Sequence, residues 1–454
     1  MELTFFGASQ EVTGSNYLLE TENTRILIDC GLLQGGRFVN PENYQPFPYD
    51  VKNLDALFVT HAHIDHTGKI PKLCKDGFRG KIYSTGPTKD FSELLLLDSE
   101  HLLRRDAVEQ GLNPIYDLND INEAMKLWEK VSYHEEIHLK DFKVEFFDAG
   151  HILGSAFIVV TEKATGKRVC FSGDLGNQPA PLVKDTEQIS DVDYVLIEST
   201  YGDRVHDDPA TRKNRLEDAI EDAMNLKGVL MIPAFAMERT QELLYEMDDL
   251  AENGRVPGCP VFVDSPLAIK LTAIYKKYSQ DPMYFDEESI SQSKAGMEFF
   301  DFPRLRFTLT TEQSKSINEA PMPKIIIAGS GMSNGGRILH HELRYLPDPN
   351  TTILMIGYQA KGTLGRSILE GASMVRIMGE EVPVRCRVAT ISGYSAHADQ
   401  PLLLHWLHPM RQSLQKVFIV HGDMDQMEPF AQKVRDEFAL NAVIPTHGMK
   451  VTLS

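Results

Sequence analysis

The chain has 454 residues, enough for two or three domains that each bury a core, and its 42% hydrophobic and 24% charged residues are typical of globular proteins. Lys and Arg total 46 against 65 Asp and Glu, and the resulting charge of −19 disfavours a polyanionic partner, although metal-binding carboxylates would account for part of the deficit. No apolar run is long enough to cross a bilayer, and the five scattered cysteines indicate free thiols in a reducing cytoplasm rather than disulfides or a thiolate zinc site.

Residues 1–203 are predicted to form short strands with few long helices. Strands are expected at 3–6, 16–20, 25–29 and 56–60, each ending at a Gly, Asn or Asp turn signal, and again at 143–150, 155–161, 168–174 and 194–200. Helices are expected over 87–109 and 117–130. This pattern predicts a hairpin-rich α/β domain.

Strands and helices alternate after Asp203. Helices are predicted over 211–228, 238–254 and 335–346, and strands over 229–235, 260–264, 324–329 and 352–357. The alternation predicts a parallel sheet flanked by helices, in a separate domain over 204–372. Residues 373–454 return to mixed strands and helices.

The segment "FVTHAHIDHTGK" at 58–69 concentrates metal-ligand side chains. His61 and His63 follow a predicted strand and lie two residues apart, so they can point the same way and bind one ion together. Asp65 and His66 follow the turn, before a helix predicted to open over 66–73, and can reach a second ion. Imidazole and carboxylate ligands without thiolate favour catalytic Zn²⁺, with Mn²⁺ as the alternative. Burying these groups without a metal would leave unpaired polar atoms.

Three polar residues elsewhere also follow apolar strands, where α/β folds collect functional groups. They are His151 in "DAGHILGS", Asp174 in "FSGDLG" and His421 in "IVHGD". Other histidines lack such a setting and are predicted to be ordinary surface or core residues: His101, His134, His138, His206, His340, His341, His405, His408 and His447.

Together, "THAHIDH" at 60–66, His151, Asp174 and Asp29 of "LIDCG" resemble the motifs of the metallo-β-lactamase superfamily. The segments "ESTYGDR", "SGYSAHAD" and "IVHGD" resemble the additional motifs of its β-CASP branch, whose members are nucleases acting on RNA or DNA. The resemblance covers essentially the whole chain. It implies an α/β protein with a metallo-β-lactamase αββα sandwich over 1–203 and 373–454, and an inserted β-CASP domain over 204–372.

The resemblance also implies roles for particular residues. Two Zn²⁺ ions would share the bridging Asp174, with His61, His63 and His151 at one ion and Asp65, His66 and His421 at the other. Asp29 would orient ligands. His397 would give a proton to the leaving oxygen, with Glu198 as its partner, where the alternatives are a helix cap for His397 and a turn acid for Glu198. The paired ions would activate water and keep a formal charge of roughly +1, which suits a phosphate.

Segments of the inserted domain also resemble the family. In "AGSGMSNGGR", a strand leads through small residues into a helix, and backbone N–H groups could cradle a phosphate. The candidates are Ser330, Gly331 and Gly335, with Arg337 as a charged support, and a plain tight turn is the alternative. Arg239 in "PAFAMERTQELL" and Arg366 in "KGTLGR" are further candidates for RNA backbone contacts, against intradomain salt bridges.

The leading hypothesis is a cytoplasmic, metal-dependent ribonuclease that cuts single-stranded RNA internally. A DNA nuclease or a 5′–3′ exoribonuclease of the same branch is the first alternative, and His421 tilts the choice toward RNA because DNA-acting members tend to have an apolar residue there. A non-catalytic scaffold would have lost ligands that this chain retains. A small-molecule hydrolase such as a thioesterase would not need the large insertion. Besides RNA, the chain could pair with a second copy of itself.

Overall fold

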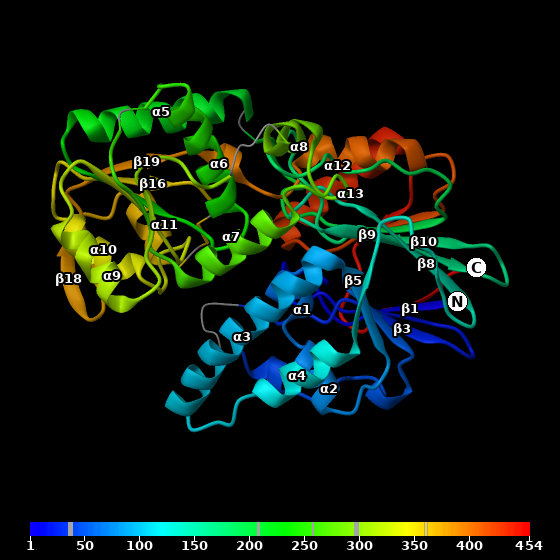
Figure 1. The fold of residues 1–454 in the computed structure, drawn as a ribbon. Helices are drawn as coiled ribbons and strands as arrows, with labels where there is room; N and C mark the ends of the chain where they lie inside the picture. Colours follow the sequence, from blue (N-terminus) through cyan, green and yellow to red (C-terminus); the bar gives the residue numbers. More distant parts are fainter. Residues whose placement is uncertain (35–39, 207–208, 257, 295–298, 358, 361) are drawn as a thin grey trace. The chain divides into compact units, whose positions relative to one another are not determined.

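The computed structural model divides the chain into two compact units, Met1–Val205 with His397–Ser454, and His206–Ala396. It describes residues 1–34, 40–206, 209–256, 258–294, 299–357, 359–360 and 362–454. Each unit is described below by itself (Figure 1).

The first unit contains two mixed sheets, each built around parallel strands. The first sheet has the order β22-β1-β2-β3-β4-β5-β6. Its strands are β22 (Lys450–Thr452), β1 (Glu2–Phe5), β2 (Tyr17–Glu20), β3 (Arg25–Ile28), β4 (Ala56–Phe58), β5 (Lys81–Thr85) and β6 (Trp128–Val131). Strands β3 to β6 are parallel, whereas β22, β1, β2 and β3 pair antiparallel with one another.

The second sheet has the order β21-β20-β11-β10-β9-β8-β7. Its strands are β21 (Ala442–Val443), β20 (Lys416–Ile419), β11 (Tyr194–Ile197), β10 (Arg168–Phe171), β9 (Ala156–Glu162), β8 (Phe142–Asp148) and β7 (Ile137–His138). Strands β21, β20, β11 and β10 are parallel, and β9 and β8 continue as antiparallel hairpins.

Helices cover the outer faces of these two sheets (Figure 1). The first sheet packs on α1 (Ile64–Thr67), α2 (Ile70–Lys75), α3 (Gly86–Glu109) and α4 (Leu118–Leu127), and the second on α12 (Gln400–Leu407) and α13 (Met424–Phe438). Aromatic rings fill the space between the sheets. The ring centroids of Phe5 on β1 and Phe418 on β20 lie 5.1 Å apart, and those of Phe58 on β4 and Phe146 on β8 lie 6.1 Å apart. This layering is the predicted αββα sandwich, and burial of these apolar faces is its main stabilisation.

The second unit contains the predicted parallel sheet, in the order β14-β13-β15-β12-β16-β19. Its strands are β14 (Leu305–Phe307), β13 (Val261–Val263), β15 (Lys324–Ala328), β12 (Val229–Pro233), β16 (Thr352–Met355) and β19 (Arg387–Thr390). The helices are α5 (Pro209–Asn225), α6 (Arg239–Glu252), α7 (Pro266–Tyr278), α8 (Glu287–Lys294), α9 (Thr311–Ser316), α10 (Ile338–Tyr345) and α11 (Leu364–Leu369). A separate hairpin joins β17 (Met374–Ile377) to β18 (Glu380–Pro383).

The second boundary of the inserted domain differs from the predicted 372/373. The chain returns to the first unit at His397, because β19 still pairs with β16 of the inserted sheet and the β17–β18 hairpin packs on its core. Period and turn signals indicated strands in this stretch but could not indicate which sheet they join. Within the described residues, no helix is long and apolar enough to cross a membrane. The cysteines are free and buried.

Candidate metal centre

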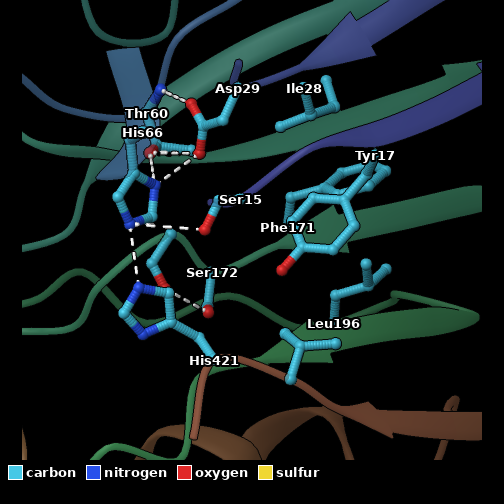
Figure 2. A pocket seen from close by; sticks show the side chains of 12 residues that line it. Ser15, Tyr17, Ile28, Asp29, Thr60, His66, Phe171, Ser172, Leu196 and His421 are labelled. Carbon is cyan, nitrogen blue, oxygen red and sulfur yellow. Dashed lines mark hydrogen bonds and ion pairs between the residues drawn. The ribbon is translucent and has the colours of Figure 1, made fainter. Parts of the chain in front are cut away.

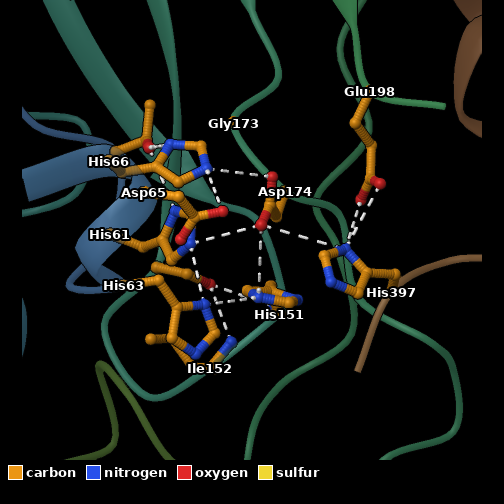
Figure 3. A network of polar contacts seen from close by, with 12 residues as sticks. His61, His63, Asp65, His66, His151, Ile152, Gly173, Asp174, Glu198 and His397 are labelled. Carbon is orange, nitrogen blue, oxygen red and sulfur yellow. Dashed lines mark hydrogen bonds and ion pairs between the residues drawn. The ribbon is translucent and has the colours of Figure 1, made fainter. Parts of the chain in front are cut away.

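The two predicted ligand groups each come together in the first unit. In the first group, His61 Nε2 lies 3.0 Å from His63 Nδ1, and His151 Nε2 lies 3.3 Å from the same His63 atom. In the second, His66 Nε2 lies 3.1 Å from His421 Nε2, which is 3.4 Å from Asp65 Oδ2. Figure 3 shows most of these side chains converging from separate loops.

Asp174 lies between the two groups and turns one oxygen toward each. Its Oδ2 is 3.3 Å from His61 Nε2 and 3.6 Å from His151 Nε2. Its Oδ1 is 3.4 Å from His66 Nε2 and 3.6 Å from His421 Nε2. A carboxylate in this position can serve two cations at once, the role that the family resemblance implies for Asp174.

The spacing of the donor atoms fits tetrahedral coordination. Zn–N bonds of about 2.0–2.1 Å place neighbouring tetrahedral ligands about 3.3–3.4 Å apart. The closest donor pairs within the groups lie 3.0 to 3.6 Å apart and bracket that value, and His66 Nε2 lies 4.0 Å from Asp65 Oδ2. In addition, Asp174 Oδ1 is buried and has no hydrogen-bond partner among the described residues. A bound cation would offset that cost, so these residues fit divalent metal ions.

The histidines of the first group are held in the form that binds metal. Burial lowers the pKa of His61, and it lowers the pKa of His63 to about 3 and that of His151 further below the usual value. Burial also acts on His66 and His421, but the carboxylates that face them together outweigh it and raise their pKa, Asp174 with Asp29 at His66 and Asp174 with Asp65 at His421. The carboxylates of the second group thus favour a positive charge on His66 and His421, and a bound metal cation would supply positive charge at the same place.

Local backbone structure presents the first four ligands. Strand β4 ends at Phe58, and α1 begins at Ile64 with His63 as its N-cap, so Asp65 and His66 lie inside a short helix rather than before one. The Cys30 N–H donates to the His66 carbonyl and the Ser15 N–H to the Asp65 carbonyl. Gly31 makes this approach possible, since a Cβ there would lie 1.6 Å from the Asp65 carbonyl oxygen.

The other ligands occupy tight turns after strands of the second sheet. His151 follows Gly150, whose φ is +63°, and its N–H donates to Ser155 Oγ over 3.0 Å. His421 itself has a φ of +52° after β20, and its N–H donates to the Ala8 carbonyl. Such positive φ values are uncommon outside glycine and occur at functional sites.

Asp29 contacts the side of the His66 ring that faces away from Asp174 and His421. Its Oδ2 lies 2.7 Å from His66 Nδ1, and Thr60 donates to both carboxylate oxygens, through its N–H and its hydroxyl, each over 2.8 Å. Because the carboxylate only accepts, Nδ1 carries the proton and Nε2 faces the ligand group. A cavity of about 10 Å³ adjoins this arrangement (Figure 2), room for at most one water molecule.

Glu198 and His397 lie beside the first group (Figure 3). His397 Nδ1 is 3.3 Å from each oxygen of Glu198 and 3.8 Å from Asp174 Oδ2. Glu198 is fully buried, and its Oε1 accepts the Leu175 N–H over 2.7 Å. Asp399 caps α12, so the helix-cap alternative for His397 does not apply. Despite burial, the Glu198 carboxylate raises the pKa of His397 to about 9.

The glycine-rich segment of the second unit forms a closed loop between β15 and α10. Ser330 N–H donates to the Gly335 carbonyl over 3.1 Å, and Ser330 Oγ accepts the Asn334 N–H over 3.0 Å. A Cβ on Gly335 would meet no atom of the described residues within 4 Å, so this side of the loop is open. This geometry is compatible with both interpretations of the segment, a tight turn and a phosphate cradle.

The three candidate arginines are engaged within the second unit. Arg239 is 6% exposed and is ion-paired with Glu242 and Glu238, so its guanidinium is buried within the unit. Arg366 Nε donates to Glu370 over 2.7 Å, one helical turn further on, and Lys361 of the same motif lies outside the described residues. Arg337 pairs with Asp264 over 2.8 Å. At each arginine the salt bridge is the arrangement found.

Some residues that shape the centre were not predicted. Thr60 binds Asp29, Ser172 Oγ accepts the Glu198 N–H over 3.0 Å, and Thr200 Oγ1 lies 3.3 Å from His421 Nδ1. Each is a hydroxyl within three residues of a predicted site residue at a strand end. That proximity is the signal that could have identified them, although hydroxyls are common in such turns.

Relatives that match nearly end to end include proteins named as ribonucleases. Ribonuclease TTHA0252 of Thermus thermophilus is 37% identical over 454 residues, covering 100% of this chain and 98% of that protein. An RNase J-like protein of Methanocaldococcus jannaschii is 31% identical and 98% of each chain is covered. Transcription termination factor FttA of Methanosarcina mazei is 31% identical over 93% of this chain and 67% of its own length.

A solved structure shares the fold at low identity. The crystal structure of a protein of unknown function from Enterococcus faecalis V583 has a TM-score of 0.56 at 12% identity, covering 100% of this chain and 99% of that one. At this identity the likeness concerns the fold alone.

Family descriptions match consecutive parts of the chain. Residues 10–234 match the metallo-beta-lactamase superfamily, 240–368 the Beta-Casp domain, and 381–445 the Zn-dependent metallo-hydrolase RNA specificity domain. The sandwich and its histidine–aspartate cluster define a metal-binding hydrolase of the metallo-β-lactamase type. With the inserted parallel sheet and the relatives above, the chain belongs to the β-CASP branch of that superfamily.

Proposed function

We propose that the protein is a metal-dependent ribonuclease that hydrolyses internal phosphodiester bonds of single-stranded RNA. The observation that carries this proposal is the pair of ligand groups joined by Asp174, with His397 beside them. Relatives named as ribonucleases and a matching segment described as an RNA specificity domain support RNA as the substrate. The free, buried cysteines support a reducing, cytoplasmic setting.

Two Zn²⁺ ions, or Mn²⁺ in their place, are the proposed cofactors. His61, His63 and His151 would hold one, and Asp65, His66 and His421 the other, with Asp174 shared. When bound, the ions supply Lewis acidity and lower the pKa of water. The five histidines are neutral ligands, so the two carboxylates leave the centre cationic and attractive to a phosphate. Asp29 holds the His66 ring in place through the 2.7 Å contact at Nδ1.

His397 is the proposed general acid. The Glu198 carboxylate lies against Nδ1, so Nε2 remains to give a proton to the leaving oxygen. The buried carboxylate also stabilises the protonated imidazole, and it fixes the ring orientation. Neither residue is needed to hold metal in this scheme, because both ligand groups are complete without them.

Ser330, Gly331 and Gly335 are the proposed phosphate contacts of the second unit. The open side of the loop at Gly335 and its position just before α10 support this role, since backbone N–H groups at a helix start favour anions.

Incubation with 5′-labelled single-stranded RNA and DNA, with and without a chelator, tests this function. We expect a ladder of internal RNA products that disappears with the chelator. Cleavage of DNA alone would support the DNA nuclease alternative, release of mononucleotides from the 5′ end the exoribonuclease alternative, and no cleavage at any metal concentration would contradict the proposal. The FttA relatives extend well beyond the matched part, so their termination role is not extended to this chain.

A further inference from the structure

A buried carboxylate of the second unit accepts hydrogen bonds from four side chains. Asp264 follows β13 and is fully buried. Its Oδ1 accepts from Thr308 Oγ1 over 2.7 Å and from Arg337 over 2.8 Å. Its Oδ2 accepts from Ser314 Oγ and His341 Nε2, each over 2.7 Å. Both oxygens are thus saturated by short, partly charge-assisted hydrogen bonds, which are among the strongest in proteins.

The residues that donate to Asp264 come from several different elements. Thr308 follows β14, Ser314 lies in α9, and His341 lies in α10. Although burial raises the pKa of Asp264, the hydrogen bonds from these residues and Arg337 lower it to about 2, so the group is a carboxylate at neutral pH. Removing one partner would leave the others facing a poorly satisfied buried group.

Arg337 links this carboxylate to the glycine-rich loop. It directly follows the loop and is the N-cap of α10. Besides Asp264, its guanidinium donates to the carbonyls of Thr308 over 2.8 Å and Leu309 over 2.9 Å. Three fixed acceptors hold the planar group from one side, and the side chain is only 21% exposed. Three of its five N–H donors are thus engaged, both of those on Nη1 and one on Nη2.

Contacts on the inner side complete the support of the loop. Ser333 Oγ donates to the buried carboxyl group of Glu342, and Gln359 Nε2 donates to the Gly331 carbonyl over 2.9 Å. The Ile338 N–H donates to the Gly329 carbonyl and closes the base of the loop. The N–H groups of Gly335 and Gly336, in contrast, have no acceptor among the described residues, whereas Gly331 is buried against the Phe235 ring. The loop is held on one side and offers donors on the other.

We infer that Asp264 and Arg337 form a brace that positions the glycine-rich loop, residues 329–336, to bind a phosphate of RNA, and that Arg337 does not touch the RNA itself. This inference rests on the proposed function. Arg337 and Asp264 are positioning residues, and the phosphate is bound by the loop backbone and Ser330. A preorganised neutral cradle binds more tightly because the loop loses little conformational freedom when the anion binds.

The alternative role of Arg337 as a direct phosphate ligand predicts different behaviour. A direct ligand contributes about 0.7 to the slope of log Kd against log salt concentration for a single strand. A brace residue contributes nothing to that slope. Replacing Asp264 would also free a direct ligand and strengthen binding, whereas loss of a brace weakens it.

The test measures the Kd of a fluorescently labelled single-stranded oligouridine for the full chain across a salt series, with EDTA present so that the RNA stays intact. The variants are Arg337→Met, Arg337→Lys, Asp264→Asn and the double variant Asp264→Asn/Arg337→Met. Arg344→Met, at an exposed position of the same helix, is the matched control. Thermal unfolding of each variant reports folding, and Ser330→Ala tests the cradle itself.

We expect Arg337→Met and Asp264→Asn each to raise Kd about tenfold with an unchanged salt slope, as loss of one charged hydrogen bond predicts. Arg337→Lys should restore little, since Lys lacks the planar fork, and the double variant should be no weaker than either single one. Tighter binding by Asp264→Asn, a smaller slope for Arg337→Met, or an unchanged Kd would overturn the brace. An unchanged Kd for Ser330→Ala as well would show that the proposed cradle fails, and the brace with it.

Discussion

His66 and His421 are 355 residues apart in sequence, yet their Nε2 atoms lie 3.1 Å apart. His66 belongs to α1, beside the first sheet, and His421 follows β20 of the second sheet. The whole inserted unit, His206–Ala396, separates them along the chain. The second ligand group is therefore completed only when the chain has returned to the first unit, and a folded sandwich is required before both groups exist.

Replacing His397 by Ala should slow RNA cleavage by at least about 100-fold, because the leaving oxygen loses its proton donor. Metal content should remain that of the unmodified protein. A phosphodiester with a nitrophenyl leaving group needs no such proton, so its hydrolysis should be much less affected. Rates on both substrates and metal analysis of the same preparation check this prediction.

His405→Ala is the matched control for that variant, since His405 is exposed on the neighbouring helix α12. Its rates should equal those of the unmodified protein. Equal losses on RNA and on the nitrophenyl ester would argue against an acid role for His397.

Replacing Asp29 by Asn should weaken binding of metal at the second group about 10- to 100-fold, the usual effect of losing the partner of a ligating histidine. The carboxylate that holds His66 Nδ1 at 2.7 Å would become an amide that cannot accept at both oxygens. Competition with a chromophoric chelator measures the affinity. Asp55→Asn, at an exposed carboxylate that accepts the Arg25 N–H, should behave as the unmodified protein. Indistinguishable affinities would remove Asp29 from the centre.

Replacing Gly335 by Val should weaken RNA binding without unfolding the protein. The new side chain has space, since no described atom lies within 4 Å of a Cβ there, but it would occupy the open side of the loop. We expect at least a tenfold higher Kd for single-stranded RNA, about the loss of one charged hydrogen bond. Ser316→Val, at an exposed site of the same unit, is the control. Normal RNA affinity of the Gly335 variant would exclude the loop from the binding surface.

Glu342 should make stability depend on pH. Burial raises the pKa of this carboxyl to about 8 from an ordinary 4.5, although the Ser333 hydroxyl opposes the shift. The folded protein therefore keeps a proton that the unfolded chain has released, and the free energy of unfolding should fall as pH rises from 4.5 to 8, by up to about 1.4 kcal/mol per pH unit. Glu342→Gln removes this dependence.

Thermal unfolding at several pH values measures that difference. The midpoint of Glu342→Gln relative to the unmodified protein should rise between pH 5 and pH 8, the window given by the two pKa values of about 4.5 and 8. Glu319→Gln, at an exposed position of the same unit, should show no such trend. A constant offset of the Glu342 variant at all pH values would mean that the carboxyl is ionised in the folded protein.

Much of the fold and of the metal cluster could be predicted from local sequence. The apolar runs before His61, His151, Asp174 and His421 mark strands, and polar residues after strands are where such folds place functional groups. The long helix predicted over 87–109 is present as α3, Gly86–Glu109. The parallel sheet of the inserted unit followed from the alternation of strands and helices.

What could not be predicted depends on distant packing. The turn before His397 belongs to the inserted unit because β19 pairs with β16. The sequence of a strand does not by itself indicate which strand it pairs with. Arg337 was predicted to be a charged support of a phosphate cradle, but its ion pair with Asp264, distant in sequence, was not predicted. His341 was expected to be an ordinary core residue, and its buried bond to that same carboxylate agrees, but the network around it was not foreseen.

The most direct test of the two-metal centre is the zinc content of the purified chain at saturating zinc, measured by inductively coupled plasma mass spectrometry beside the Asp174→Asn and His421→Ala variants. The arrangement of donors around the two oxygens of Asp174 predicts about two ions per chain. The His421 variant should retain about one. A single ion per chain in the unmodified protein, persisting as zinc is raised, would contradict the two-metal centre.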